Sequence, residues 1–508
     1  MSDSVSQSAA KPPGLSLRQI LPGATFHHTG DLTVSGCAGQ WDECRPNDLF
    51  VALVGDQRDG HEDAERAIAR GATAILSERL LPVARPQCIV DDSRVAFGTI
   101  THALRDNPAE RMLTVAAAGD DGKSSVLALL ESILRQAGRQ PARSASPNRP
   151  GGCPAWTPPR LANWLARTRD EGSQAALIET RSGDWQQRQI DGARFDSLIM
   201  TNVRRRRPGG PGAPWTGTGG YLKPHGKLIL NLDDPLSGAR CADLDPQHRM
   251  TIGIRESADL RATVVESGLN GQAFTVRLAG ESTLIETPVP GAAHIYHCLQ
   301  AMAAALQAGL DPATIAAGLN SIRSLPGRLE RVSCGQAFPV FIDQADSPYR
   351  LGSALNLLRR HTPGRVICVF STPAESTPVD ARKTGRIAEQ GSDIPVISRE
   401  EVPVQLDYEA DHRILDGFER PARAHLIPDR ITAIEWALSQ AGADDAVLIA
   451  GRGDQSICSL EEGRRELTDH EVCQAWLYNH DSLRPTPLIP VVNPQIFRMD
   501  DYRGPGRA

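Results

Sequence analysis

Short runs of apolar residues alternate along the chain with longer amphipathic stretches that end in glycine. This alternation is typical of parallel strands connected by helices that cover the sheet, and it predicts an α/β protein. The first such unit has a strand at 49–53, a helix at 64–70 closed by Gly71, and a strand at 72–76. Further strands are predicted at 113–118, 228–232, 340–342, 366–370 and 446–450, and two more end at Ile178 and Met200. Helices are predicted at 124–137, 351–360 and 431–438.

The length of the chain and its punctuation predict three domains. A chain of 508 residues accommodates about three units of ordinary size. Asn107-Pro108 and Pro326-Gly327 interrupt the pattern and place boundaries near 108 and 326. We therefore expect domains at 1–108, 109–326 and 327–482, followed by a loosely ordered tail at 483–508 that is rich in Pro and Arg.

Composition excludes several classes of protein. Apolar residues make up 40% of the chain and charged residues 23%, which is typical of a folded protein. The balance of 55 Lys and Arg against 61 Asp and Glu gives a net charge of −6, which does not predict a nucleic-acid binder. The ten cysteines are scattered without a C-x-x-C pair, so we expect reduced thiols and no zinc site. Without a signal peptide or a membrane span, the protein is expected in the cytoplasm.

The sharpest local motif is the run Gly119-Asp120-Asp121-Gly122-Lys123-Ser124-Ser125, which stands between a predicted strand and a predicted helix. This is the context of a phosphate-binding loop, in which Gly119, Gly122, Lys123, Ser124 and Ser125 would bind a nucleotide. Lys123 would reach the terminal phosphates and the Ser124 hydroxyl would ligate Mg²⁺.

The motif is partial, because Ala117 stands where the full spacing has a glycine. The alternative is a strand-to-helix turn that binds nothing. Asp120 and Asp121 favour that alternative, since carboxylates repel a triphosphate unless they point away or lie near the cation.

At this point the chain resembles the Mur ligase family, and within it the UDP-N-acetylmuramoyl-tripeptide synthetase branch, which adds the third peptide residue to the cell-wall precursor. The resemblance covers most of residues 15–480, and its motifs follow the family's order. In the first third, 46–53 and 59–61 are similar to the family's PGDLFVAL and DGH. In the centre, the segments similar to GTNGKTT, TP, MEVSSH, TN and NADDP are, in that order, 119–125, Thr157-Pro158, Glu179, Thr201-Asn202 and 231–235. Further along, the segments similar to LPG, GRMERV, FVDYAH and LIAGKGHE are 289–291, 327–332, 341–343 and 448–453.

The resemblance implies a three-domain Mur ligase architecture: a UDP-substrate-binding-like domain, a central P-loop ATPase-like domain with a parallel sheet, and a Rossmann-like C-terminal domain. It implies ATP and Mg²⁺ as cofactors and a UDP-linked muramoyl peptide as a substrate. Lys123, Glu179 and Asn202 would be catalytic, with Ser124 and Glu179 on Mg²⁺. Arg328 and Asp343 would bind the nucleotide from the third domain. Such enzymes join a carboxylate to an amine through an acyl phosphate.

Departures from the family pattern concentrate in the expected catalytic region. The Asp-His pair that follows TN falls on Arg206 and Arg207, within a run of four arginines from Arg204. Because a guanidinium repels a cation, a second metal is not expected there. These arginines either clamp phosphate oxygens themselves or form a solvated basic loop.

The segment 208–226 is too rich in Gly and Pro to form the helix that carries the family's modified lysine, and neither Lys223 nor Lys227 is a convincing substitute.

Substrate motifs also differ. The family's DSR motif, whose serine helps to hold UDP, is replaced by Gln40-Trp41-Asp42. The family's SSHAL segment is replaced by residues 181–185, and the DNPR motif that selects diaminopimelate is not found. His294 and His297 replace two asparagines near the base pocket, either as a metal-binding pair or, as we favour, as packed histidines.

Two hypotheses follow. The first is a divergent Mur-type ATP-dependent ligase that joins an amino acid to a carboxylate substrate. The second is a catalytically impaired Mur-ligase-like protein that keeps the fold for binding or scaffolding. A third, weaker hypothesis is a protein that retains ATP binding or hydrolysis without ligation. Neither the amino acid nor the oligomeric state can be read from the sequence.

Overall fold

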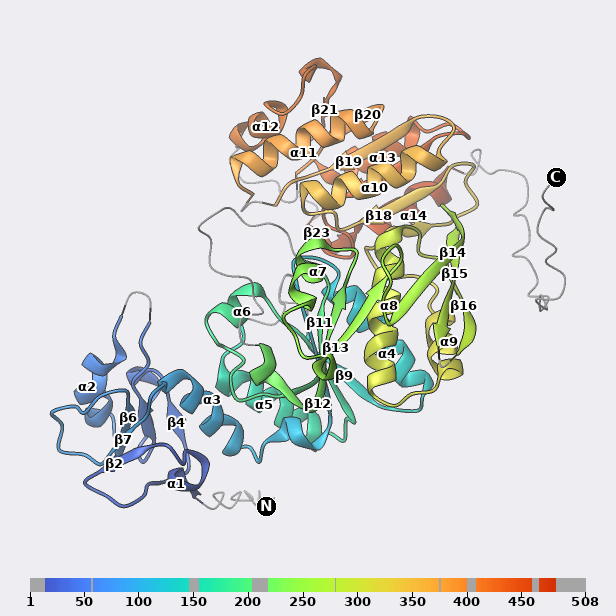
Figure 1. Ribbon diagram of the computed structural model, residues 1–508. Coiled ribbons are helices and arrows are strands. Elements are labelled where there is room, and N and C mark those ends of the chain that lie inside the picture. Colours follow the sequence, from blue (N-terminus) through green and yellow to red (C-terminus); the bar gives the residue numbers. More distant parts are fainter. Residues whose placement is uncertain are drawn as a thin grey trace, which may run out of the picture. The chain divides into compact units, whose positions relative to one another are not determined.

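Helices pack on parallel-rich sheets throughout the computed structural model, which describes residues 14–55, 58–145, 155–202, 218–278, 280–373, 376–399, 408–458 and 466–480 (Figure 1). The α/β class predicted from the sequence is confirmed. The chain divides into two compact units, Met1–Leu325 and Pro326–Ala508. The four arginines at 204–207 and the tail 483–508 lie outside the described residues.

The first unit begins with a five-stranded sheet in the order β2-β7-β6-β5-β4. Helix α2 (Ala64–Ala69) connects the parallel strands β5 and β6, so the predicted strand-helix-strand unit is confirmed. Apolar residues of this sheet pack against helix α3 (Ser93–Ala103) in one core. The elements are β1 (Leu15–Ser16), α1 (Leu17–Ile20), β2 (Thr25–His27), β3 (Thr33–Val34), β4 (Cys37–Ala38), β5 (Leu49–Val51), β6 (Ala74–Ser77) and β7 (Gln87–Ile89).

A nine-stranded sheet in the order β16-β15-β14-β13-β12-β11-β8-β10-β9 follows in the same unit. Alternate residues of its strand β8 (Leu113–Ala118) enter two cores: Val115 lies on the side covered by α4 (Lys123–Gln136) and α8 (Ala292–Gln307), and Ala116 on the side of α5 (Pro158–Asp170). Burial on both faces explains why the parallel strands read as continuous apolar runs. The other elements are β9 (Pro141–Arg143), β10 (Ala175–Glu179), α6 (Ser182–Gln186), β11 (Phe195–Met200), β12 (Leu222–Asn231), α7 (Pro235–Cys241), β13 (Arg249–Gly253) and α9 (Pro312–Asn320).

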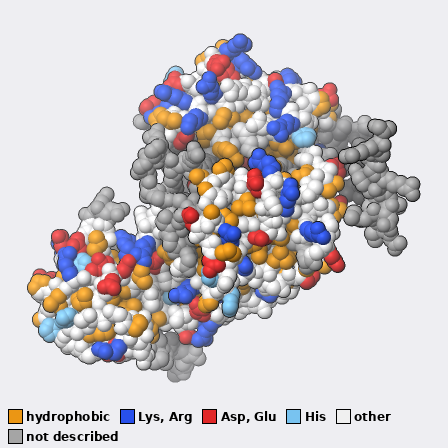
Figure 2. All heavy atoms as spheres, viewed as in Figure 1, with side chains coloured by type: hydrophobic (Ala, Val, Ile, Leu, Met, Phe, Trp, Pro, Cys, Tyr) orange, Lys and Arg blue, Asp and Glu red, His pale blue; other side chains and the backbone are white. Residues whose placement is uncertain are grey.

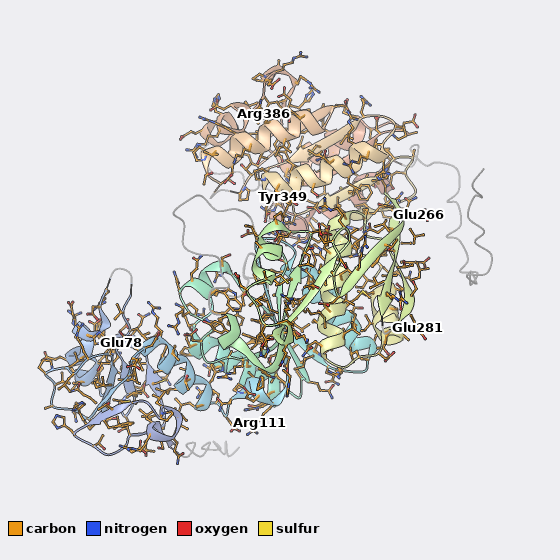
Figure 3. The ribbon with its side chains drawn as sticks, viewed as in Figure 1. Glu78, Arg111, Glu266, Glu281, Tyr349 and Arg386 are labelled. Atoms are coloured by element: carbon orange, nitrogen blue, oxygen red, sulfur yellow. The ribbon has the colours of Figure 1, made fainter. Side chains whose placement is uncertain are left out.

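The antiparallel strands β14 (Leu260–Gly268), β15 (Gly271–Leu278) and β16 (Glu281–Thr287) extend this sheet, and the sequence reading did not predict them. Phe274 and Ile285 pair across the ladder and are buried, while neighbouring positions face solvent. Glu266 and Glu281 lie at the solvent-exposed ends of these strands (Figure 3).

The second unit contains a six-stranded sheet in the order β17-β18-β22-β19-β20-β21. The predicted strands β19 (Val366–Phe370) and β22 (Ala446–Ala450) pair in parallel near its centre, and every residue of both is buried. The other elements are β17 (Glu330–Val332), β18 (Val340–Asp343), α10 (Pro348–His361), α11 (Pro378–Gly391), β20 (Ile394–Ile397), α12 (Tyr408–Leu415), β21 (His425–Leu426), α13 (Arg430–Ser439), β23 (Ser456–Cys458), β24 (Glu466–Thr468) and α14 (Asp469–Asn479).

Acidic and basic side chains are interspersed on the face seen in Figure 2, in keeping with the small net charge. Within the described ranges, no helix combines the length and the apolar character that crossing a bilayer requires. Eight cysteines in that part of the chain are free thiols: Cys37, Cys44, Cys88, Cys241, Cys298, Cys334, Cys368 and Cys473.

Candidate functional site

The turn between β8 and α4 depends on two glycines. Gly119 and Gly122 have φ angles of 126° and 86°, which lie in the region that favours glycine. A Cβ atom on Gly119 would collide with Thr201 and with the Asn202 carbonyl, and one on Gly122 would collide with the imidazole of His297. The loop is therefore closely enclosed by the end of β11 and by α8.

Asn202 lies two residues beyond the end of β11 and holds this loop. Its side-chain oxygen accepts a hydrogen bond of 2.8 Å from the Asp121 amide, and its carbonyl accepts one of 3.2 Å from the Asp120 amide. Helix α4 is 14 residues long, and no side chain caps its first turn. Uncapped amides at the start of such a helix attract anions, so this end of α4 is suited to bind phosphate.

Lys123 is buried at the start of α4. Its ammonium group donates hydrogen bonds to the carbonyls of Gly119, at 2.8 Å, and Asp120, at 3.3 Å. Both of these acceptors are neutral carbonyls, and the buried carboxylate of Asp184 also lies within electrostatic reach of the ammonium group. The two carbonyl bonds hold the lysine over the loop, where a cation favours an anionic ligand.

Ser124 and Glu179 are joined by a hydrogen bond of 2.6 Å from the serine hydroxyl to the carboxylate. Glu179 is buried at the end of β10, where its amide donates to Ser144 at 2.9 Å and its carbonyl accepts from the Trp156 indole at 3.0 Å. Mg²⁺ prefers oxygen ligands and is usually bound through one or two carboxylates together with substrate phosphates, so this pair fits it. Among the described residues, no group of three or more His, Cys, Asp or Glu forms a ready-made metal cage.

Asp184 is a second buried carboxylate near the loop. Burial raises its pKa, while the amide hydrogen bond from Arg181 and the charge of Lys123 act in the opposite direction. The sequence reading did not select Asp184, Ser144 or Trp156 as site residues. An isolated polar or aromatic residue carries no motif, so only their placement around Glu179 and Lys123 marks them.

Arg328 and Asp343 lie close together in the second unit. The Asp343 carboxylate accepts backbone hydrogen bonds from Leu329, at 2.8 Å, and Ala345, at 2.7 Å, and its distance to the Arg350 guanidinium is 3.8 Å. Desolvation lowers the pKa of Arg328 to about 10, and the Arg350 charge adds to this shift. The structure brings together Lys123, Ser124, Glu179 and Asn202 in the first unit and Arg328 and Asp343 in the second. Their roles stay predictions.

Other sequence candidates are placed differently. His294 is packed, because its Nε2 lies 2.8 Å from the Thr287 hydroxyl and burial lowers its pKa to about 3. Lys223 forms an ion pair of 2.8 Å with Asp196 at the amino-terminal edge of the sheet, opposite the phosphate loop, so it does not replace the modified lysine there. Trp41, from the altered DSR motif, lies under the guanidinium of Arg66.

Comparisons with known proteins point to one family. Residues 327–453 match the model for the family described as Mur ligase, glutamate ligase domain. The chain is 30% identical to UDP-N-acetylmuramoyl-L-alanyl-D-glutamate--2,6-diaminopimelate ligase of Geobacillus kaustophilus (strain HTA426), over 91% of this chain and 98% of the relative. It is 31% identical to the ligase of the same name from Xanthomonas campestris pv. campestris (strain 8004), over 90% and 96%.

Solved structures share the fold. A structure of UDP-N-acetylmuramoyl-L-alanyl-D-glutamate--2,6-diaminopimelate ligase aligns with a TM-score of 0.66 and 21% identity, over 92% of this chain and 99% of the other. MurF ligase from Thermotoga maritima aligns with a TM-score of 0.54 and 16% identity, over 88% and 98%.

Proposed function

Because the chain belongs to the Mur ligase family, we propose that it is an ATP-dependent ligase that joins the carboxylate of an acid substrate to the amine of an amino acid. The observation that carries this proposal is the phosphate loop. Uncapped amides at the start of α4, the buried ammonium of Lys123 and the bonded pair of Ser124 and Glu179 meet at one turn. This set supplies positive charge and cation ligands where a triphosphate would lie.

The proposed reaction has two steps. A carboxylate oxygen attacks the γ-phosphorus of ATP, the bond to ADP breaks, and an acyl phosphate forms. The amine nitrogen then attacks the acyl carbon, phosphate leaves, the amide bond forms and the amine proton passes to solvent. Lys123 would stabilise the charge of the transferred phosphoryl group. Ser124 and Glu179 would hold Mg²⁺, which neutralises phosphate charge when it is bound.

The names of the relatives suggest the substrates. Those ligases are named for UDP-N-acetylmuramoyl-L-alanyl-D-glutamate and 2,6-diaminopimelate, and we propose the first as the acid substrate of this chain. Arg328 and Asp343 are proposed to bind nucleotide from the second unit, and the solved Thermotoga maritima ligase is a complex with ADP. The location proposed for this reaction is the cytoplasm.

ATP binding and phosphate release test the proposal. Mg-ATP at 100 times its dissociation constant should stabilise the protein by about 2.7 kcal/mol, measured as a rise in melting temperature. Phosphate release should then depend on the UDP-linked acid and on one amino acid of a panel that includes 2,6-diaminopimelate. Lys123→Ala should abolish both effects. Lys223→Ala, at the opposite edge of the sheet, is the matched control and should retain both.

The binding or scaffolding hypothesis predicts a different result. A chain that has lost catalysis would release no phosphate with any acid and amino acid, whether or not Mg-ATP raised its melting temperature. ATP hydrolysis independent of the acid would instead support the third hypothesis.

A further inference from the structure

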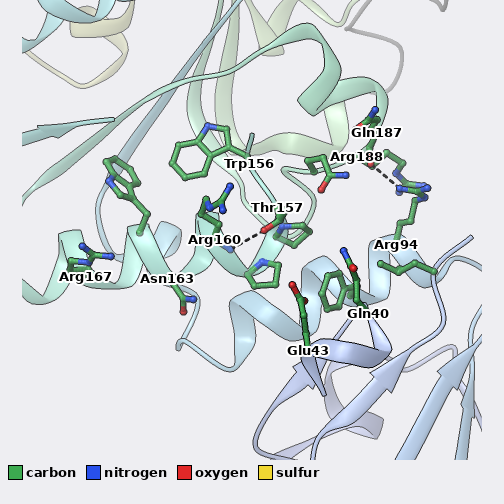
Figure 4. Close-up of a pocket in the computed structure, with 17 residues that line it drawn as sticks. Gln40, Glu43, Arg94, Trp156, Thr157, Arg160, Asn163, Arg167, Gln187 and Arg188 are labelled. Carbon is green, nitrogen blue, oxygen red and sulfur yellow. Dashed lines mark hydrogen bonds between the residues drawn. The ribbon is translucent and has the colours of Figure 1, made fainter. Parts of the chain in front are cut away.

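A cavity of about 630 Å³ lies in the first unit, between the amino-terminal sheet, helix α5 and the turn at 187–189 (Figure 4). Four guanidinium groups and one carboxylate line it, so its walls favour an anionic ligand. The charged lining residues are Arg94, Arg160, Arg167, Arg188 and Glu43.

Trp156 connects this cavity to the phosphate loop. Its ring lines the cavity, and its indole N–H donates to the carbonyl of Glu179, whose side chain accepts from Ser124. One wall of the cavity is therefore bonded directly to the backbone of the residue that carries the candidate catalytic carboxylate.

Arg188 differs from the other three arginines in its backbone and its partners. Its φ angle is 58°, a left-handed conformation that is uncommon for residues other than glycine. Its guanidinium pairs with Asp191, at 2.9 Å, and with Asp92. Backbone hydrogen bonds hold this turn, from the Arg188 amide to the Trp185 carbonyl at 3.1 Å and from the Gln189 amide to the Asp184 carbonyl at 2.7 Å, while the two carboxylates hold the guanidinium.

The two carboxylates differ in how firmly they are held. The Asp191 side chain is 5% exposed and accepts a hydrogen bond from the Tyr221 hydroxyl, so it is anchored in the protein. The Asp92 side chain is 40% exposed, and Arg188 itself is 35% exposed. Water can reach the second pair but not the Asp191 carboxylate, so Asp92 is the partner that a competing anion can replace.

Asp92 also joins two parts of the unit. It caps the start of α3, and the nearby Arg94 donates a hydrogen bond of 3.1 Å to the Gln187 carbonyl (Figure 4). The start of α3 is thus tied to the turn that carries Arg188 at the edge of the cavity.

We propose that Asp92 is an internal counter-ion that occupies Arg188 until an anionic group of the acid substrate displaces it, while Asp191 keeps the guanidinium in place. Arg188 then determines specificity for an anion in the cavity, and binding releases one link between α3 and the turn. The inference rests on the proposed function for the identity of the acid. Its chemistry requires only a polyanion such as a diphosphate.

Removing the charge of Asp92 and loosening the anchor of Asp191 should have opposite effects on the affinity for the anion. Asp92→Asn removes the competitor, so the affinity for the anion should rise about three- to tenfold. Arg188→Gln removes the binding group and should lower affinity at least about tenfold. Tyr221→Phe loosens the anchor at Asp191 and should lower affinity a few-fold, without placing an amide at that buried position. A loss of fold would lower affinity in every variant, so a rise in Asp92→Asn cannot come from destabilisation.

Calorimetric titration of the full chain without ATP tests this order, with UDP-N-acetylmuramoyl-L-alanyl-D-glutamate and inorganic pyrophosphate as separate probes. Asp106→Asn is the matched control, because Asp106 pairs on the surface of the same unit with Arg111, which does not line the cavity, whereas the partner of Asp92, Arg188, does. The expected order of affinity is Asp92→Asn, then wild type and Asp106→Asn together, then Tyr221→Phe and Arg188→Gln.

Two results would overturn the inference: binding of neither probe to the wild type, or an affinity for Asp92→Asn equal to or below that of Asp106→Asn. The expected order with pyrophosphate alone would uphold the counter-ion and reject the UDP-linked acid as substrate. Because no ATP is present, a failure of ligase turnover leaves this result unaffected.

Discussion

The Ser124 hydroxyl donates a hydrogen bond of 2.6 Å to the Glu179 carboxylate, although the two residues are 55 positions apart in the chain. Ser124 lies in the first turn of α4, and Glu179 ends β10, the strand that pairs in parallel with β8. Parallel strands end at the same edge of a sheet, so this contact follows from topology. It places one hydroxyl and one carboxylate beside the amides that would receive phosphate.

Glu179→Gln should uncouple ATP binding from Mg²⁺. The amide still accepts a hydrogen bond from Ser124, but it lacks the negative charge that Mg²⁺ requires. We expect the Mg²⁺-dependent gain in ATP affinity to fall about tenfold or more, and phosphate release to fall about a hundredfold. ATP titrations with and without Mg²⁺ measure the first effect. Glu131→Gln is the control, because Glu131 lies on α4, the helix of Ser124, and pairs with Arg135 and Arg143. An unchanged Mg²⁺ dependence in Glu179→Gln would contradict the assignment.

Gly122→Ala and Gly138→Ala should differ, although both glycines are left-handed and flank the same helix. An added methyl meets nothing within 4 Å at Gly138 but collides with His297 at Gly122. Gly138→Ala should therefore cost only the conformational penalty of about 1–2 kcal/mol. Gly122→Ala should cost more and remove ATP-induced stabilisation. Melting curves with and without Mg-ATP compare the two, and an intact ATP response in Gly122→Ala would refute a binding role for the loop.

Stability should fall in acid partly through His102. This side chain is buried in α3, and both ring nitrogens have no hydrogen-bond partner within the described structure. Burial lowers its pKa to about 4, against about 6.5 in an unfolded chain. The unfolded state therefore binds an extra proton between these values, and stability is lost as the pH falls through this window.

His102→Leu should reduce this dependence by up to about 1.4 kcal/mol per pH unit. Urea unfolding between pH 4.5 and 6.5 measures it, with exposed His480→Leu as the control. The same slope in His102→Leu and wild type would show that His102 does not contribute.

The buried ion pair of Arg430 and Asp469 should stabilise the second unit. Both side chains are at most 1% exposed, and two hydrogen bonds of 2.8 Å join them. Asp469→Asn would leave a buried guanidinium without its counter-ion, which costs about 3–5 kcal/mol. Removing the exposed pair of Arg386 and Glu419 with Glu419→Gln should cost less than about 1 kcal/mol. Thermal unfolding of the full chain compares them, and equal costs would contradict the prediction.

The sequence predicts best the elements whose apolar residues are buried on both sides. The strands at 113–118, 366–370 and 446–450 have the predicted bounds, because continuous burial leaves a continuous apolar run. It did not predict β14–β16, whose half-exposed residues carry a weaker signal. It placed His294 and His297 on a helix but gave no bounds for α8, which is apolar nearly all round.

The candidate site shows the same division. Lys123 and Ser124 belong to a local motif, and family resemblance selects Glu179. Trp156 and Arg188 act through contacts with residues distant in sequence, so no local pattern marks them.

Asn202 also has a consequence for how a nucleotide would meet the loop. Because the amides of Asp120 and Asp121 are already bonded to Asn202, just beyond the end of β11, the protein itself fixes the conformation of the turn before a nucleotide binds. The loop backbone would already have its binding conformation, so binding a triphosphate would cost little backbone conformational entropy. The affinity for the triphosphate would then come mainly from electrostatic attraction, and added salt should lower this affinity more than moderate warming does.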